Sequence, residues 1–203
     1  MFNKISKSIT NVISQYSNLN ERELAYFNYG LQALLGTILE FLILLLIAYL
    51  LSVFYPVLIA IISFLILRPH AGGIHLPTYI LCMSFSIVIF LILGFIAKFA
   101  VISTSGLLVW LIIVFNFSLY MIKKYAPADT NTIPIKDPSR RETLKNKSVI
   151  IISIWIIVSI LTTLLTNEFN NIIIASSLGI LTEVLGMHPF IFNLCEKYLT
   201  EHN

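Results

Sequence analysis

The chain has 203 residues, of which 58% are hydrophobic and only 11% are charged, and its net charge at pH 7 is +3. A soluble domain is about 25% charged, and a single core of this size cannot hide so much apolar surface from water. The composition therefore excludes an ordinary soluble protein. The small, clustered positive charge is typical of membrane orientation rather than of nucleic-acid binding. The two cysteines lie far apart and fit neither a disulfide framework nor a zinc finger.

The amino-terminal stretch is predicted to be an amphipathic helix. Apolar residues from Phe2 to Tyr16 recur every three or four positions, and Lys4 and Lys7 lie between them. Two interpretations stay open: a helix that lies on the membrane surface, and a helix that packs against the protein's own loops. The first twenty residues contain no long apolar core before a small-residue cleavage site, so we expect no removed signal peptide.

Six apolar segments follow, and they predict an all-α, polytopic bundle of about six transmembrane helices in a single membrane-embedded domain, 1–203. Five segments have 18 or more residues, which is enough to cross about 30 Å of hydrocarbon. The second segment has 14 residues and is short for a span. The expected segments are Leu31–Ser52, Phe54–Leu67, Tyr79–Ala97, Ser105–Ile122, Ser148–Thr166 and Ile172–Ile191.

The basic residues predict the orientation of these spans. If the amino terminus is cytoplasmic and all six segments cross, the cytoplasmic parts are 1–30, 68–78, 123–147 and 192–203. They hold 12 of the 13 Lys and Arg residues, and only Lys98 lies outside. The positive-inside rule then places both termini in the cytoplasm. The expected loop 123–147 has seven basic and three acidic residues, which would fix topology, bind anionic lipid headgroups or attract an acidic substrate.

The stretch between the second and third spans holds the candidate chemistry. Gly72 and Gly73 allow unusual backbone conformations, and Pro77 favours a helix start, so we expect His75 in a loop before the third helix. In an unbroken helix, residues seven apart lie about 10 Å apart, which is too far for an imidazole to reach a thiol. A break in the helix lets His75 fold back toward Cys82, where it can take the thiol proton and leave a nucleophilic thiolate.

Other interpretations stay open at this point. A lone cysteine in a membrane helix is usually a packing residue, and a lone histidine at a boundary usually contacts headgroups or water. A metal site built from His70, His75 and Cys82 lacks an evident fourth ligand, so we expect no metal or cofactor. The chain would also suit a small transporter or export component without peptidase activity, or a signalling scaffold. No inverted repeat and no pair of broken helices supports the transporter.

Three polar residues inside the spans are further candidates. Glu40 and Glu183 are ionisable groups within apolar segments, where such groups are costly and are functional candidates by default. Either carboxyl group would serve to orient His75, or would be a protonated structural group between helices. Gln32 lies nearer the cytoplasmic surface and would either donate to a developing oxyanion or form an interhelical hydrogen bond.

Three blocks of residues carry a family resemblance over nearly the whole chain. The first comprises Arg68, Gly72, Gly73, His75, Pro77 and Cys82; the second comprises Tyr125-Ala-Pro-Ala, Pro134 and the basic run through Lys147; the third comprises Glu183 and Pro189, and Gln32 accompanies them. With these blocks the chain resembles the accessory gene regulator B family. Members of that family are membrane endopeptidases that process the precursors of autoinducing peptides in Gram-positive quorum sensing.

This resemblance implies a membrane-embedded cysteine endopeptidase in which His75 is the general base and Cys82 is the nucleophile. Its substrate would be a short precursor peptide with an amphipathic amino-terminal helix and an acidic carboxyl-terminal tail. The enzyme would remove the tail, hold the upstream part as an acyl-enzyme thioester, and promote closure of a thiolactone or lactone ring by a substrate side chain. A site that excludes bulk water favours that exchange over hydrolysis.

The expected partners follow from the same reasoning. The protein would contact the lipid bilayer and its precursor peptide and bind no nucleic acid, and a homo-oligomer is compatible with the sequence. Basic residues would bind the acidic tail of the precursor. The residues expected to do so are Arg68, Lys136, Arg140, Arg141 and Lys145.

Overall fold

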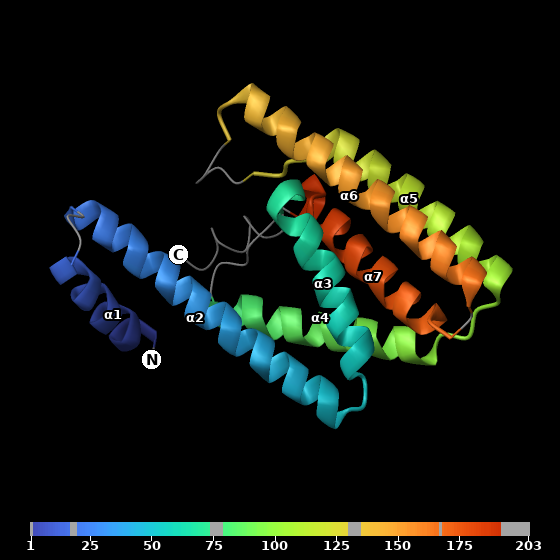
Figure 1. Ribbon diagram of the computed structural model, residues 1–203, viewed down its shortest axis with the longest axis horizontal. Helices are drawn as coiled ribbons and strands as arrows, with labels where there is room; N and C mark the ends of the chain where they lie inside the picture. Colours follow the sequence, from blue (N-terminus) through green and yellow to red (C-terminus); the bar gives the residue numbers. More distant parts are fainter. Residues whose placement is uncertain (1, 17–19, 74–78, 130–134, 167, 192–203) are drawn as a thin grey trace. The chain divides into compact units, whose positions relative to one another are not determined.

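A computed structural model describes residues 2–16, 20–73, 79–129, 135–166 and 168–191 (Figure 1). Five of the helices in this part of the chain are long and apolar enough to cross a membrane, and a sixth apolar helix is shorter. The expected all-α, multi-pass fold is therefore confirmed. The elements are α1 (Phe2–Tyr16), α2 (Glu21–Leu50), α3 (Phe54–Ala71), α4 (Tyr79–Phe99), α5 (Thr104–Tyr125), α6 (Pro138–Leu165) and α7 (Asn170–Gly186).

Helices α3 and α7 end at different residues from those expected. α3 continues through Pro69 to Ala71 and has 18 residues, which makes it about 27 Å long and sufficient for a span. It stops where Gly72 adopts a φ of +76°. α7 ends at Gly186 and not at the expected Ile191, because a proline at position 189 disfavours helical geometry in the residue before it.

Two helices begin ten residues before the expected span: α2 begins at Glu21 instead of Leu31, and α6 is the second case. We expected a span from Ser148 and a loop over 123–147, but the helix begins ten residues earlier, at Pro138. Asp137 is its N-cap, and the side chain accepts a hydrogen bond from the backbone N–H of Ser139 at 3.0 Å. Proline is favoured at the first position of a helix, because its missing N–H would have no helical partner there. Much of the basic segment is therefore helical.

The internal contacts divide the chain into two units, 1–47 and 48–203, and each is described by itself. In the first unit, α1 buries Ser6 and Thr10 and leaves Ile5, Ile9 and Val12 exposed. A small hollow beside the polar side of α1 is lined by residues from both α1 and the first turns of α2. The apolar side thus faces outward, which favours a lipid surface over packing against the protein's own loops. The single domain expected over 1–203 stays a prediction.

In the second unit, α7 packs against α3, α4 and α5, with fewer contacts to α6 (Figure 1). At Gly179 the backbone of α7 approaches α3 so closely that an added Cβ would overlap the carbonyl group of Ala60. Such close approaches and interhelical hydrogen bonds stabilise membrane bundles. Two indole N–H groups donate to serine hydroxyls of α7: Trp110 of α5 to Ser177 at 2.8 Å, and Trp155 of α6 to Ser176 at 3.1 Å.

The ends of these helices sort into two groups. The carboxyl ends of α3, α5 and α7 and the amino end of α6 meet, as the contacts described below demonstrate. At the other end, the Lys98 ammonium donates to the Ser52 carbonyl at 3.0 Å, and the Asn171 amide donates to the Lys98 carbonyl at 3.1 Å. The described basic residues of the second unit other than Lys98 therefore lie toward one end of the bundle. That this end faces the cytoplasm stays a prediction.

Candidate functional site

A short backbone bridge joins the end of α3 to the segment that follows α5. The Gly73 N–H donates to the Ala128 carbonyl at 3.0 Å, and the Ala128 N–H donates to the Ala71 carbonyl at 2.8 Å. An added Cβ on Gly72 would overlap the Ala128 carbonyl, and both glycines have positive φ. Only glycine adopts this backbone and this close approach without strain. The Gly72–Gly73 pair, which we expected to interrupt the helix, therefore also holds the end of α3 to the segment after α5.

One turn before this bridge, Arg68 of α3 forms an ion pair with Glu183 of α7, with 3.4 Å between Nη1 and Oε2. The same Nη1 donates to the Gly72 carbonyl at 3.3 Å. The guanidinium also lies 5.6 Å from the ring centroid of Phe64, one turn earlier, and that ring meets Phe90 of α4 edge-on at 5.4 Å. Arg68 thus links α3, α7 and the glycine turn, and its aromatic neighbour reaches α4.

The carboxyl group of Glu183 is fully enclosed. Its side chain has no exposed surface, whereas that of Arg68 is 19% exposed. Oε2 faces Arg68, and Oε1 has no hydrogen-bond partner among the described residues. A buried carboxylate is costly unless a cation or hydrogen-bond donors compensate it. The ion pair with Arg68 is therefore the contact that compensates the charged form of Glu183 at this buried position.

A second ion pair fixes the chain on the other side of the bridge. The Arg141 guanidinium donates to Asp129 at 2.7 Å and to the Pro127 carbonyl at 3.1 Å, and Asp129 also accepts from the Ile135 N–H at 2.8 Å. Burial raises the pKa of Asp129, but the hydrogen bonds from Arg141 and Ile135 outweigh it and hold that pKa below its ordinary value. Arg141 therefore fastens the segment after α5 to the start of α6.

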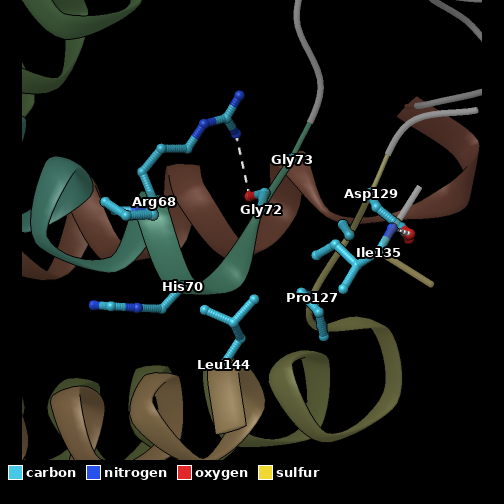
Figure 2. A pocket seen from close by; sticks show the side chains of 10 residues that line it. Arg68, His70, Gly72, Gly73, Pro127, Asp129, Ile135 and Leu144 are labelled. Carbon is cyan, nitrogen blue, oxygen red and sulfur yellow. Dashed lines mark hydrogen bonds between the residues drawn. The ribbon is translucent and has the colours of Figure 1, made fainter. Parts of the chain in front are cut away.

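A pocket of about 370 Å³ is lined by one member of each ion pair, Arg68 and Asp129 (Figure 2). Arg68 and His70 leave the end of α3 in different directions, and the Arg68 side chain bends back toward the Gly72 carbonyl (Figure 2). His70 Nδ1 is buried and has no hydrogen-bond partner among the described residues. The lining comes from α3, α6 and non-helical residues next to them: Arg68, Pro69, His70, Gly72, Gly73, Pro127, Ala128, Asp129, Ile135 and Leu144.

The predicted nucleophile lies near the start of α4. Cys82 is the fourth residue of that helix, partly exposed, and its carbonyl accepts a hydrogen bond from the Ser86 hydroxyl at 2.9 Å. His75 lies outside the described residues, so the predicted contact between its ring and Cys82 stays a prediction. Gln32 and Glu40 both lie on α2, within the first unit, and their roles likewise stay predictions.

The basic residues expected to bind an acidic tail divide into two kinds. Lys136 and Arg140 are exposed. Arg141 is held by Asp129, and the Lys145 ammonium donates to the Lys123 carbonyl at the end of α5 at 2.9 Å. Their roles in substrate binding stay predictions, but three of the five side chains, those of Arg68, Arg141 and Lys145, already contact other parts of the protein.

Sequence reasoning missed the pairing of Arg68 with Glu183 and the part played by Ala128. One signal for the ion pair was available: a carboxyl group within a span needs a partner, and Arg68 was expected at the same membrane boundary. Ala128 lies in the block Tyr125-Ala-Pro-Ala that carries the family resemblance, but that block did not predict its hydrogen bonds to α3, because a backbone bridge depends on main-chain geometry.

The fold and this junction define a multi-pass helical membrane protein. The family model for accessory gene regulator B matches residues 6–187, which is most of the chain. The chain therefore belongs to the accessory gene regulator B family, as its three blocks of residues predicted. No solved structure matches it.

Individual relatives agree with this assignment. The chain is 30% identical over 190 residues to accessory gene regulator protein B of Staphylococcus aureus (strain Newman), with 94% of each chain covered. It is 27% identical over 168 residues to an AgrB-like protein of Clostridium perfringens (strain SM101 / Type A), with 81% of this chain and 78% of the relative covered. An AgrB-like protein of Lactiplantibacillus plantarum is 29% identical over 189 residues, with 91% of this chain and 89% of the relative covered.

Proposed function

We propose that this protein is a membrane-embedded cysteine endopeptidase that removes the carboxyl-terminal tail of a quorum-sensing precursor peptide and promotes cyclisation of the remainder. The observation that carries the proposal is the position of Cys82. It is a partly exposed thiol in the first turns of a spanning helix, and that helix begins six residues after the fastened Gly73. Membership of the accessory gene regulator B family supports the same chemistry.

In the proposed reaction, His75 takes the proton from the Cys82 thiol, and the thiolate attacks the scissile carbonyl carbon. The protonated imidazole then gives its proton to the leaving amine, and the tail departs. The upstream peptide stays bound to Cys82 as a thioester. A thiol or hydroxyl within that peptide attacks the thioester carbonyl, which closes the ring and returns the Cys82 thiol.

The precursor would approach from the end of the bundle where the basic residues gather. Its acidic tail suits the exposed cations Lys136 and Arg140 near the start of α6. We propose this end as the cytoplasmic face, with both termini in the cytoplasm. Glu183, Gln32 and Glu40 stay candidates for supporting the dyad or the oxyanion.

The test uses purified protein in lipid with a candidate precursor and follows tail release. Cys82→Ala should abolish release at every pH, because no acyl-enzyme can form. Cys82→Ser should be nearly as inactive, because a hydroxyl is far less acidic than a thiol. His75→Ala should retain weak activity that rises with pH, since a thiol with no neighbouring base ionises only near pH 8.5.

Mass spectrometry of the wild-type protein should detect the upstream peptide attached to Cys82. Normal tail release by Cys82→Ala would contradict the proposal. Cys195→Ser, which changes the chain's other cysteine, is the matched control and should leave both release and the adduct unchanged.

A further inference from the structure

We propose that Arg68 and Glu183 are positioning residues: their ion pair holds the Gly72–Gly73 turn in place and thereby fixes the point from which the chain continues to His75. This inference rests on the dyad proposed above. It differs from the sequence-based expectations, in which Arg68 binds the substrate and Glu183 contacts His75 directly.

The contacts of Arg68 carry the first step. Its Nη1 reaches the Glu183 carboxylate and the Gly72 carbonyl at nearly equal distances, 3.4 and 3.3 Å. An added Cβ on Gly73 would overlap that same Nη1. The guanidinium therefore lies directly against the turn. Because Glu183 is fully buried on α7, the helix that packs most extensively on α3, the turn is tied to the interior of the bundle.

The reach of the chain carries the second step. Gly73 is fastened by the hydrogen bond to the Ala128 carbonyl, and His75 follows only two residues later. Two residues span at most about 7 Å, so the position of Gly73 limits where an imidazole at residue 75 can lie. The start of α4 at Tyr79 limits the same short segment from the other side. A displaced turn would move the base relative to the thiol.

Charge carries the third step. Binding a substrate carboxylate at Arg68 would draw the guanidinium away from Glu183, and the fully buried carboxyl group would then have to take up a proton or remain as a costly unpaired anion. The other charged residue named in the pocket lining, Asp129, is likewise paired with Arg141. The charged groups here neutralise one another, which suits positioning better than capture of an acidic tail.

The experiment measures Cys82 directly, without a substrate. In a Cys195→Ser background, the rate of alkylation by N-ethylmaleimide is followed against pH in lipid. The key variant is the double substitution Arg68→Met with Glu183→Leu, because apolar replacement of both members of a buried ion pair usually preserves the fold. Glu142→Gln, which removes an exposed charge at the same end, is the control.

In the parent protein, His75 should shift the alkylation profile to lower pH, and His75→Ala should abolish that shift. The double variant should elute and melt like the parent but react like His75→Ala, with a rate at pH 7 about tenfold lower. With a precursor peptide, its kcat should fall while KM stays within about twofold. Glu183→Gln, which keeps an acceptor for Arg68, should recover part of both losses.

Three results would overturn the inference. If a folded double variant kept the parent's alkylation profile and kcat, the ion pair would contribute to helix packing alone and would not position the dyad. A rise in KM with unchanged kcat would make Arg68 a substrate-binding residue. A parent profile that His75→Ala leaves unchanged would remove the dyad itself, and the positioning role with it, which distinguishes failure of the proposed function from failure of this inference.

Discussion

Two ion pairs flank the same backbone bridge, and they differ in almost every physical respect. Arg68–Glu183 is long, at 3.4 Å, and its carboxylate is fully buried. Arg141–Asp129 is short, at 2.7 Å, and its side chains are 40% and 21% exposed. The first joins residues 115 positions apart, and the second joins residues 12 positions apart. The shorter contact is therefore the one that water can replace more easily.

The comparison teaches that distance alone does not rank such contacts. An exposed pair competes with water and salt and contributes little to stability. Breaking a buried pair leaves an uncompensated charge where water cannot solvate it. We therefore expect the longer pair to matter more for stability and the shorter pair to matter mainly for local order.

The largest expected effect is that of Glu183→Ala. It leaves the partly buried guanidinium of Arg68 without its carboxylate and should destabilise the protein by about 3 kcal/mol. Thermal unfolding of purified protein in lipid measures this effect. Glu168→Ala, which removes an exposed carboxylate, is the control and should change stability little. Equal losses for the two variants would undo the ranking.

Gly73→Ala should have the next largest effect. The residue has a φ of +145°, and an added Cβ would meet the Arg68 guanidinium. Strain of this kind costs about 1–3 kcal/mol. Gly30→Ala lies in α2 with nothing near the added Cβ and should be neutral or stabilising, because alanine is the better helix former. The same unfolding measurement compares the two. A neutral Gly73→Ala would mean that the turn does not need its close contact with Arg68.

A smaller effect is expected from Asp129→Asn, and it should depend on pH. The native pKa of Asp129 lies below its ordinary value of 3.8. The carboxylate therefore stabilises the fold at pH values above about 4, and this contribution is lost as the pH falls through the native pKa. The variant should be less stable than the parent by under about 1 kcal/mol at pH 7, and the difference should shrink below pH 4. Denaturant titrations at several pH values would measure it, and a difference that grew on acidification would contradict the assignment.

The smallest effect on stability should come from Lys136→Gln with Arg140→Gln. Both side chains are exposed, so the free energy of unfolding should change by less than about 0.5 kcal/mol. If these cations bind the acidic tail, KM for the precursor should rise about fivefold, the equivalent of about 1 kcal/mol, and its salt dependence should weaken. Lys98→Gln, at the opposite end of the bundle, should leave KM unchanged. An unchanged KM in the double variant would remove these two residues from substrate binding.

Much of the fold was predictable because apolar length determines which segments cross a bilayer. The 14-residue second segment was the exception. Hydrophobicity ends at Leu67, but the helix continues to Ala71, since a helix carries polar residues past the hydrocarbon without breaking. The same reason explains the early start of α6 at Pro138, where capping residues rather than apolar ones mark the amino-terminal end of the helix.

The candidate site was predictable only where residue type carries the information. Cys82, Glu183 and the glycine turn stand out because thiols, buried carboxyl groups and paired glycines are unusual in spans. The ion pair between Glu183 and Arg68, which are 115 positions apart, depends on how α7 packs on α3. That packing uses the contact of Gly179 with Ala60, and the helical patterns of single segments do not specify it.

The early start of α6 also changes what a basic segment can recognise. In a flexible loop the spacing between charged side chains varies, so binding depends mainly on the number of charges on the partner. In a helix the side chains lie at fixed intervals. Arg140 and Lys147 both lie on the exposed first turns of α6, seven residues and about 10 Å apart along one side. An extended peptide advances about 3.3 Å per residue, so acidic residues three positions apart would match that interval. If the proposed acidic tail binds along this side of α6, the helix would favour tails whose charges have this spacing.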